Sequence, residues 1–153
     1  MHLKNILFVV ENIELSKRFY KELFGLEVVV DFGENVVLSE GLVLQERKLW
    51  EEFIENDVNG GGNDAELYFE ENDLDTFLEK LEQSDFMIHF LHPCKEHDWG
   101  QRVLRIYDPD RHIIEIGEAM DYVAKRLLNA GMPAEQVAKK TQLPLSLIEA
   151  MIQ

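Results

Sequence analysis

The feature that most constrains the fold is an internal repeat of one apolar pattern. A shift of 61 positions brings three pairs of apolar residues together: Ile6 with Leu67, Phe8 with Phe69, and Ile13 with Leu74. Two copies at a period too long for a solenoid predict a fused pair of similar modules. Residues 59–64, NGGGND, lie between the copies and are typical of a linker.

Each copy predicts a strand, an amphipathic helix and then three strands, so the fold class is α+β. In the first copy, Asn12 is a candidate N-cap and Gly25 a candidate C′ residue. Between them Leu15, Phe19 and Leu23 recur at four-residue spacing, which predicts the buried face of the helix. The expected strands are 4–10, 26–31, 36–38, 42–46, 65–71, 87–91, 103–107 and 112–116, and the expected helices are 13–24, 48–55 and 74–81.

Residues 99–118 predict a closing hairpin. The turn is 108–111, DPDR, in which Pro presets φ and Asp side chains bond the local backbone. Arg111 stands where such turns often need φ > 0, so either the turn shifts or some strain is tolerated. His112 is expected to pack or to bond the turn. Glu115 lies in a β-branched run, so it either faces water or has a partner.

Residues 119–153 differ from the two copies and predict a helical tail, with helices at 119–130, 134–140 and 144–151. The spacing of its apolar residues resembles a helix-turn-helix. A DNA-binding motif of this kind normally has a basic recognition face, whereas 144–149 contains no Lys or Arg. The net charge of −15 also disfavours nucleic acid and anionic membranes as partners. We therefore expect the tail to pack on its own domain or on a second subunit.

The composition is typical of a globular protein, with 153 residues of which 46% are hydrophobic. No apolar run approaches the roughly 20 residues of a membrane helix. The N-terminus resembles no signal peptide, and Cys94 has no second cysteine to pair with. These features predict a cytoplasmic location and no membrane partner.

Residues 3–118 resemble the vicinal oxygen chelate superfamily, which includes glyoxalase I, bleomycin-resistance proteins, fosfomycin-resistance enzymes and extradiol dioxygenases. The resemblance rests on the repeat, on 19–26 (FYKELFGL) and on 108–115 (DPDRHIIE), which follows the pattern D-P-D-G-H-x-x-E apart from Arg111. The run 99–102 (WGQR) and the tail resemble a bacterial subset of the superfamily. The resemblance implies a glyoxalase-like domain over 1–118, whose modules, about 1–50 and 64–118, form a curled, barrel-like mixed sheet.

The resemblance also implies a metal site on the first and fourth strands of each module. The matching positions are Asn5, Gln45 (or Glu46 after a one-residue slip), Glu66 and Glu115. The superfamily usually has His or Gln where this chain has Asn5. A set of carboxylates and amides suits Mg or Mn better than Zn or Fe, and Ni is a further candidate. The alternative is a site without a metal, in which Glu66 pairs with an arginine, for which Arg105 is the candidate.

Three functions follow from this resemblance. The first is a metal-dependent isomerase or lyase for a substrate with vicinal oxygens, with Glu115 or Glu66 as the catalytic proton carrier. The second is a metal-free protein that binds a small molecule. Its ligand-binding residues are predicted to be Asn5, Arg105, Trp99 and Tyr68. The third is a sensor whose tail mediates association. In each case we expect a small-molecule cavity and a homodimer.

Overall fold

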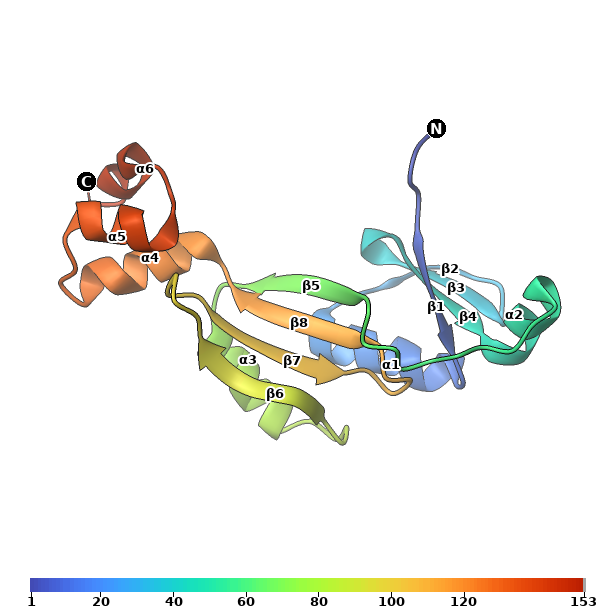
Figure 1. The fold of residues 1–153 in the computed structure, drawn as a ribbon. Helices are drawn as coiled ribbons and strands as arrows, with labels where there is room; N and C mark the ends of the chain where they lie inside the picture. The colour runs from blue at the N-terminus through green and yellow to red at the C-terminus, as the bar shows by residue number, and fades with distance from the viewer. Residues whose placement is uncertain (153) are drawn as a thin grey trace. The chain divides into compact units, whose positions relative to one another are not determined.

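The computed structural model describes residues 1–152 and divides into two compact units (Figure 1). Unit 1 comprises Met1–Glu66, Gln83–His89 and Tyr107–Ile113. Unit 2 comprises Leu67–Glu82, Phe90–Ile106 and the chain from Ile114 onward. The described residues form two open four-stranded mixed sheets with helices, as the α+β prediction requires. None of the helices in residues 1–152 is long and apolar enough to cross a membrane.

The first sheet has the strand order β1-β4-β3-β2. Its strands are β1 (Ile6–Val10), β2 (Val28–Asp31), β3 (Asn35–Leu38) and β4 (Leu42–Glu46). β1 and β4 run parallel, with Val9 opposite Gln45, whereas β3 pairs antiparallel with β4 and with β2. A short 3-10 helix, η1 (Ser39–Gly41), joins β3 to β4, and α2 (Arg47–Ile54) follows β4. The sheet therefore has two edge strands, β1 and β2.

Helix α1 (Ile13–Phe24) forms where the sequence predicts it. The Asn12 side chain accepts a hydrogen bond from the backbone N–H of Leu15, and Gly25 ends the helix at φ 70°. The buried residues are Ile13, Ser16, Phe19, Tyr20 and Leu23. Leu15 is 38% exposed, so its assignment to the buried face was wrong. The buried stripe follows the i, i+3, i+7 spacing of a helix instead, which brings Ser16 and Tyr20 inside.

The second sheet has the strand order β5-β8-β7-β6. Its strands are β5 (Glu66–Glu71), β6 (His89–Glu96), β7 (Arg102–Tyr107) and β8 (Ile113–Glu118), and α3 (Leu74–Glu82) follows β5. The strand expected at 87–91 was placed too early, because β6 begins at His89 and continues to Glu96. Pairing with β7 accounts for the extension, and the N–H of His97 donates to the carbonyl of Gln101 at 2.9 Å to close the turn.

The tail is a cluster of three helices, α4 (Met120–Asn129), α5 (Ala134–Thr141) and α6 (Leu145–Ala150). All three form close to their predicted positions. The cluster has a small apolar core of its own, made by Val123, Ala124, Leu127, Val137 and Ile148. This core includes Ile148 of α6, so it stabilises that short helix.

The turn after β7 belongs to unit 1, where it is centred on the buried side chain of Asp108. One oxygen, Oδ1, accepts hydrogen bonds from the N–H groups of Asp110 and His112 at 2.9 and 2.8 Å. The other, Oδ2, is 2.8 Å from both the Tyr20 hydroxyl, which donates to it, and Nδ1 of His112. Arg111 adopts φ 70°, so the turn does not shift and the strain is tolerated.

We expect Tyr20→Phe to lower the free energy of unfolding by about 1.5–3 kcal/mol, the usual contribution of a hydrogen bond to a charged group. Burial, and next the charge of Asp108, raise the pKa of Tyr20 well above its ordinary value of 10.0. The native state thus holds the phenol proton more tightly, so this stability is complete below pH 10.0 and falls as the pH rises above it. Urea unfolding at several pH values measures both effects. Tyr122→Phe, at an exposed site, is the control; equal losses in both variants would contradict the prediction.

Candidate functional site

A charged cluster lies on one face of the second sheet, within unit 2. The guanidinium Nη2 of Arg105 on β7 makes an ion pair with Oε2 of Glu115 on β8. Nη1 of Arg105 is 3.0 Å from Nε2 of His92 on β6. The side chains of Arg105 and Glu115 are only 25% and 13% exposed. Glu115 therefore has a partner, and that partner is a cation supplied by the neighbouring strand.

Further cationic groups gather around this pair. The pKa of His97 is lowered first by burial and then by the nearby side chains of Lys95, Arg105 and His92, whereas Asp98 acts in the opposite direction. Lys95 is exposed and makes no ion pair within residues 1–152. The face thus combines the balanced pair of Arg105 with Glu115 and the unpaired charge of Lys95, and Glu70 reaches its edge by accepting from the Tyr68 hydroxyl at 3.4 Å.

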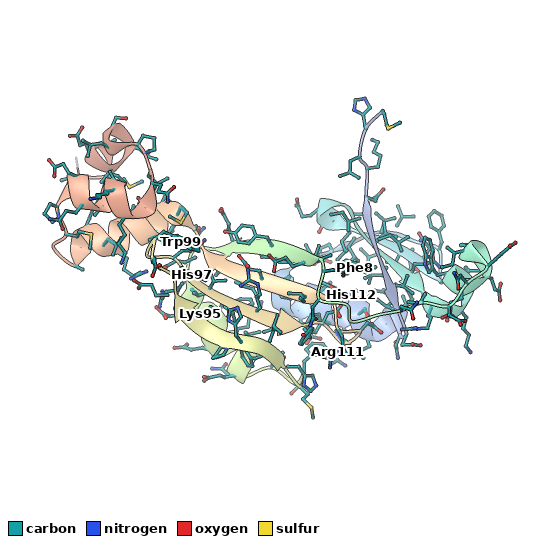
Figure 2. The ribbon with its side chains drawn as sticks, in the orientation of Figure 1. Phe8, Lys95, His97, Trp99, Arg111 and His112 are labelled. Carbon is teal, nitrogen blue, oxygen red and sulfur yellow. The ribbon has the colours of Figure 1, made fainter. Side chains whose placement is uncertain are left out.

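Aromatic side chains continue the same face as a platform formed by His97, Trp99 and Tyr68. The rings of His97 and Trp99 stack with centroids 4.3 Å apart and planes 2° apart (Figure 2). Gln101 joins the parts, since its Oε1 accepts from Trp99 Nε1 at 2.9 Å and its Nε2 donates to the Tyr68 hydroxyl at 3.2 Å. Trp99 and Tyr68 remain 39% and 48% exposed. The platform therefore offers ring surface to a ligand.

Gly117 on β8 makes room for this platform. A Cβ atom at that position would come within 2.9 Å of both Tyr68 Cε2 and Gln101 Nε2. Such an approach is too close for carbon, so any larger residue would displace Tyr68 or Gln101. Glycine at 117 is consequently a requirement of the platform rather than of the strand.

The candidate residues of the first module lie in unit 1. Gln45 on β4 is 2% exposed, and its Oε1 accepts from Asn35 Nδ2 at 2.8 Å while its Nε2 donates to the Glu34 carbonyl at 3.0 Å. Asn5 is exposed and donates to the Gly41 carbonyl at 3.3 Å. Glu46 caps α2 by accepting from the N–H of Leu49 at 2.8 Å. Glu66, the first residue of β5, is exposed.

Comparison with known proteins identifies the family. Residues 3–121 match the family model described as a glyoxalase-like domain. The chain belongs to this family. Residues beyond 121, and with them most of the helical tail, lie outside the match. No match was found among curated proteins.

Solved structures agree with the glyoxalase-like assignment. A protein of unknown function from Agrobacterium tumefaciens is 34% identical, with 78% of this chain and 94% of that chain covered and a TM-score of 0.67. A glyoxalase-related enzyme from Fulvimarina pelagi is 22% identical (77% and 88% covered, TM-score 0.66). A fosfomycin resistance protein from Mesorhizobium loti is 15% identical (77% and 92% covered, TM-score 0.58). At these lower identities the likeness is one of fold.

The donor atoms of this glyoxalase-like chain fit a metal poorly. Across residues 1–152 no group of three or more His, Cys, Asp or Glu side chains is arranged to hold an ion. The amide of Gln45 is fully used within its own hairpin, and Glu115 is neutralised by Arg105. A divalent ion bound at Glu115 would lie beside a guanidinium and be repelled by it.

Sequence reasoning missed four residues of this face: His92, Lys95, His97 and Gln101. A local signal exists for two of them, because Lys95 and His97 have the two-residue spacing that places side chains on one side of an extended chain. Ending the expected strand at residue 91 concealed this signal.

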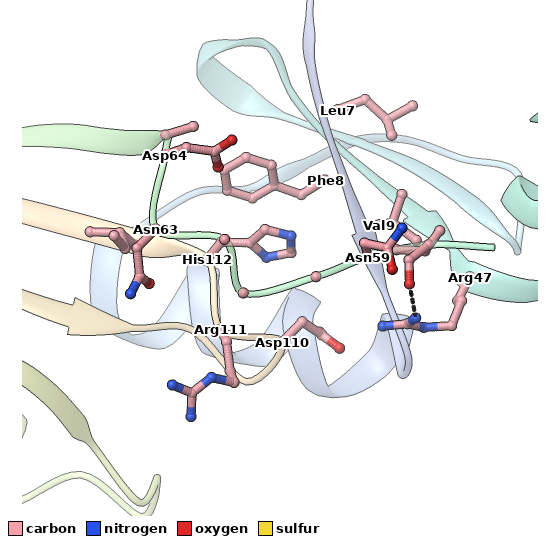
Figure 3. A pocket seen from close by; sticks show the side chains of 16 residues that line it. Leu7, Phe8, Val9, Arg47, Asn59, Asn63, Asp64, Asp110, Arg111 and His112 are labelled. Carbon is pink, nitrogen blue, oxygen red and sulfur yellow. Dashed lines mark hydrogen bonds between the residues drawn. The ribbon is translucent and has the colours of Figure 1, made fainter.

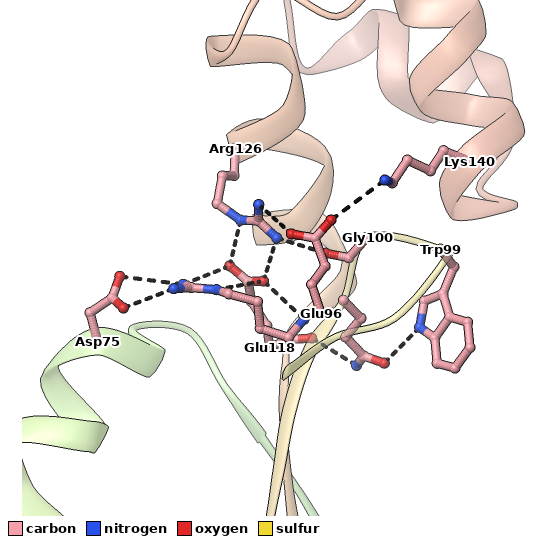
Figure 4. A network of polar contacts seen from close by, with 9 residues as sticks. Asp75, Glu96, Trp99, Gly100, Glu118, Arg126 and Lys140 are labelled. Carbon is pink, nitrogen blue, oxygen red and sulfur yellow. Dashed lines mark hydrogen bonds and ion pairs between the residues drawn. The ribbon is translucent and has the colours of Figure 1, made fainter. Parts of the chain in front are cut away.

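A buried carboxylate ties the glyoxalase-like sheet to the tail (Figure 4). Glu118 is 3% exposed, with Oε1 3.1 Å from Arg102 Nη2 and Oε2 2.9 Å from Arg126 Nη2 on α4. Its backbone carbonyl accepts from Gln101 Nε2 at 2.9 Å, and Arg126 also donates to the Gly100 carbonyl at 2.6 Å. The tail and the platform therefore share one set of polar contacts.

Glu118→Gln tests this connection. Burial alone would raise the pKa of Glu118, but hydrogen bonds from Arg126 and Arg102 outweigh it and lower the pKa below 4.5. Its stabilising effect is then complete above pH 4.5 and is lost as the pH falls through the lowered value. We expect the variant to lose about 3–5 kcal/mol at neutral pH and to show a weaker acid dependence, measured by urea unfolding. Asp121→Asn, in an exposed pair with Lys125, should cost under about 1 kcal/mol. An unchanged acid dependence would count against the connection.

Proposed function

We propose that this glyoxalase-like protein binds a small anionic molecule on the charged and aromatic face of unit 2, without a metal ion. The observation that carries the proposal is the ion pair of Arg105 with Glu115, at a position where the family resemblance implies a metal ligand. The guanidinium supplies the positive charge that a metal would bring. Glu115 then needs no cation from solution.

The surrounding residues indicate what kind of molecule would fit. The ammonium group of Lys95 makes no ion pair with the described residues, so it can pair with an anion. The stacked rings of His97 and Trp99 suit a planar, apolar part of a ligand. A carboxylate, phosphate or sulfonate attached to a planar group matches both features.

The metal-dependent isomerase or lyase is the weaker alternative. It would use Glu115 or Glu66 to move a proton, and Glu115 would first have to give up Arg105. Breaking a largely buried ion pair costs several kcal/mol, which a bound metal would need to offset. The metal-free hypothesis requires no such rearrangement.

We also propose a sensor role with a homodimer as a second candidate. The observation that favours a sensor is the sharing of Gln101 and Glu118 between the platform and the tail. An occupied platform could alter the tail through these contacts. The dimer hypothesis draws on β2, an edge strand whose residues Val28, Val29 and Val30 are all exposed. A sedimentation equilibrium experiment that gave only the mass of the monomer would contradict the dimer hypothesis.

A fluorescence titration tests the binding proposal. Trp50→Phe leaves Trp99 as the single tryptophan of the chain, so its emission reports on the platform alone. In this background we expect anilinonaphthalene sulfonate, a planar anion, to quench Trp99 in the presence of EDTA. The neutral analogue N-phenylnaphthylamine should bind more weakly. Lys95→Gln should weaken sulfonate binding about ten-fold, the effect of one charged hydrogen bond.

Lys125→Gln is the matched control, since Lys125 is an exposed lysine of the tail that pairs with Asp121. It removes the same charge and should leave the sulfonate affinity unchanged. Equal affinity for the sulfonate and the neutral analogue would contradict the proposal, and so would binding that EDTA abolishes. Circular dichroism of each variant separates loss of binding from loss of fold.

A further inference from the structure

A pocket of about 230 Å³ lies entirely within unit 1 (Figure 3). Its walls come from β1, from the glycine-rich linker after α2 and from the turn that follows β7. Neither Asn5, Gln45 nor Glu66 lines it. Its volume is below the roughly 300–1,000 Å³ of drug-sized sites, so only a very small molecule would fit.

His112 lines this pocket with its ring held in one orientation. Phe8 stacks on the imidazole, with centroids 4.0 Å apart and planes 10° apart. Nδ1 lies 2.8 Å from Oδ2 of Asp108, which also accepts from the Tyr20 hydroxyl. Because a carboxylate oxygen accepts hydrogen bonds, Nδ1 carries the proton. In the neutral ring the lone pair is then on Nε2.

Nε2 of His112 has no hydrogen-bond partner among residues 1–152. Figure 3 shows the imidazole pointing into the pocket from the side opposite Asn59 and Arg47, whereas the Arg111 guanidinium points away. Nε2 is thus an acceptor that points into the pocket and has no partner among the described residues. It is suited to a ligand that carries a hydrogen-bond donor. The arrangement resembles the carboxylate-oriented histidines of binding and catalytic sites.

The opposite end of the pocket offers donors. Arg47 makes an ion pair with Glu11 through Nε and donates from Nη1 to the Val58 carbonyl at 3.3 Å, while Nη2 has no hydrogen bond within residues 1–152. Gly60 lies beside Nη2, since a Cβ built there would be 3.9 Å from it. The backbone N–H groups of 60–62 also make no hydrogen bond with the described residues. Gly61 has φ 76°, a conformation that favours glycine.

Two carboxylates also line the pocket, and Oδ1 of one of them, Asp64, is 3.1 Å from the place that a Cβ on Gly62 would take. The Asp110 carboxylate already has hydrogen-bond donors in unit 1. It accepts from the N–H of Glu11, which precedes α1, at 2.9 Å and from Ser16 Oγ on α1 at 3.4 Å. Burial, and then the charge of Asp108, raise the pKa of Asp110 and so reduce its preference for the charged form. Asp64 is exposed.

We propose that this pocket binds a small carboxylic acid that also carries an O–H or N–H donor, such as a short hydroxy acid. The carboxylate lies at Nη2 of Arg47 and the N–H groups of 60–62. The donor of the acid points to Nε2 of His112. The site differs from the face of unit 2, and its residues belong to neither the implied metal set nor the aromatic platform.

Nuclear magnetic resonance of protein with isotope-labelled histidine tests the proposal, with glycolate and acetate as probes. The two acids share the carboxylate, and only glycolate has the hydroxyl. We expect the nitrogen shifts of the neutral His112 ring to show the tautomer with its proton on Nδ1. Glycolate should move these signals saturably and bind several-fold more tightly than acetate.

Two variants separate the ends of the site. His112→Asn keeps a donor for Asp108 and removes Nε2, so glycolate should bind no better than acetate, followed through the backbone amides of 60–62. Arg47→Gln should weaken both acids, whereas Lys21→Gln, which removes an exposed charge of unit 1, should weaken neither. Equal binding of the two acids to the wild type would overturn the proposal. So would a neutral ring protonated on Nε2, or a preference for glycolate that survives in His112→Asn.

Discussion

The buried carboxylate of Asp108 is the interaction on which unit 1 depends. It accepts four hydrogen bonds, three from its own turn and one from Tyr20, which lies 88 residues earlier on α1. It thereby joins the final hairpin turn of the second sequence copy to the first helix of the chain. The turn also holds Arg111 at φ 70°, a cost of about 1–2 kcal/mol that these hydrogen bonds offset. The same carboxylate orients His112.

In unit 2 the corresponding constraint is the ion pair of Arg105 with Glu115. Glu115 stands where the family resemblance implies a metal ligand, and here its partner is a guanidinium. The charge of the face then comes from side chains, and Lys95 and the aromatic platform extend it. Glu118 and Arg126 carry the same polar network into the tail, most of which is outside the family match.

Much of the fold could be predicted from the sequence because apolar spacing and turn residues are local signals. The strand–helix repeat and the three tail helices could be predicted from these signals. The prediction that Leu15 is buried was wrong, because four-residue spacing alone does not locate the buried face of a helix. The site was less predictable. The pairing of Arg105 with Glu66 was one of two open alternatives, and the pair of Arg105 with Glu115 depends on β7 and β8 being neighbours in the sheet. The space that Gly117 leaves for Tyr68 arises from packing and has no local signal.

The most direct measurement is anomalous diffraction from crystals grown with manganese. The metal-free account predicts no anomalous peak at Glu115, with the Arg105 guanidinium still paired to its carboxylate. A peak bonded to Glu115, with Arg105 displaced, would contradict the central claim and restore the metal-dependent alternative.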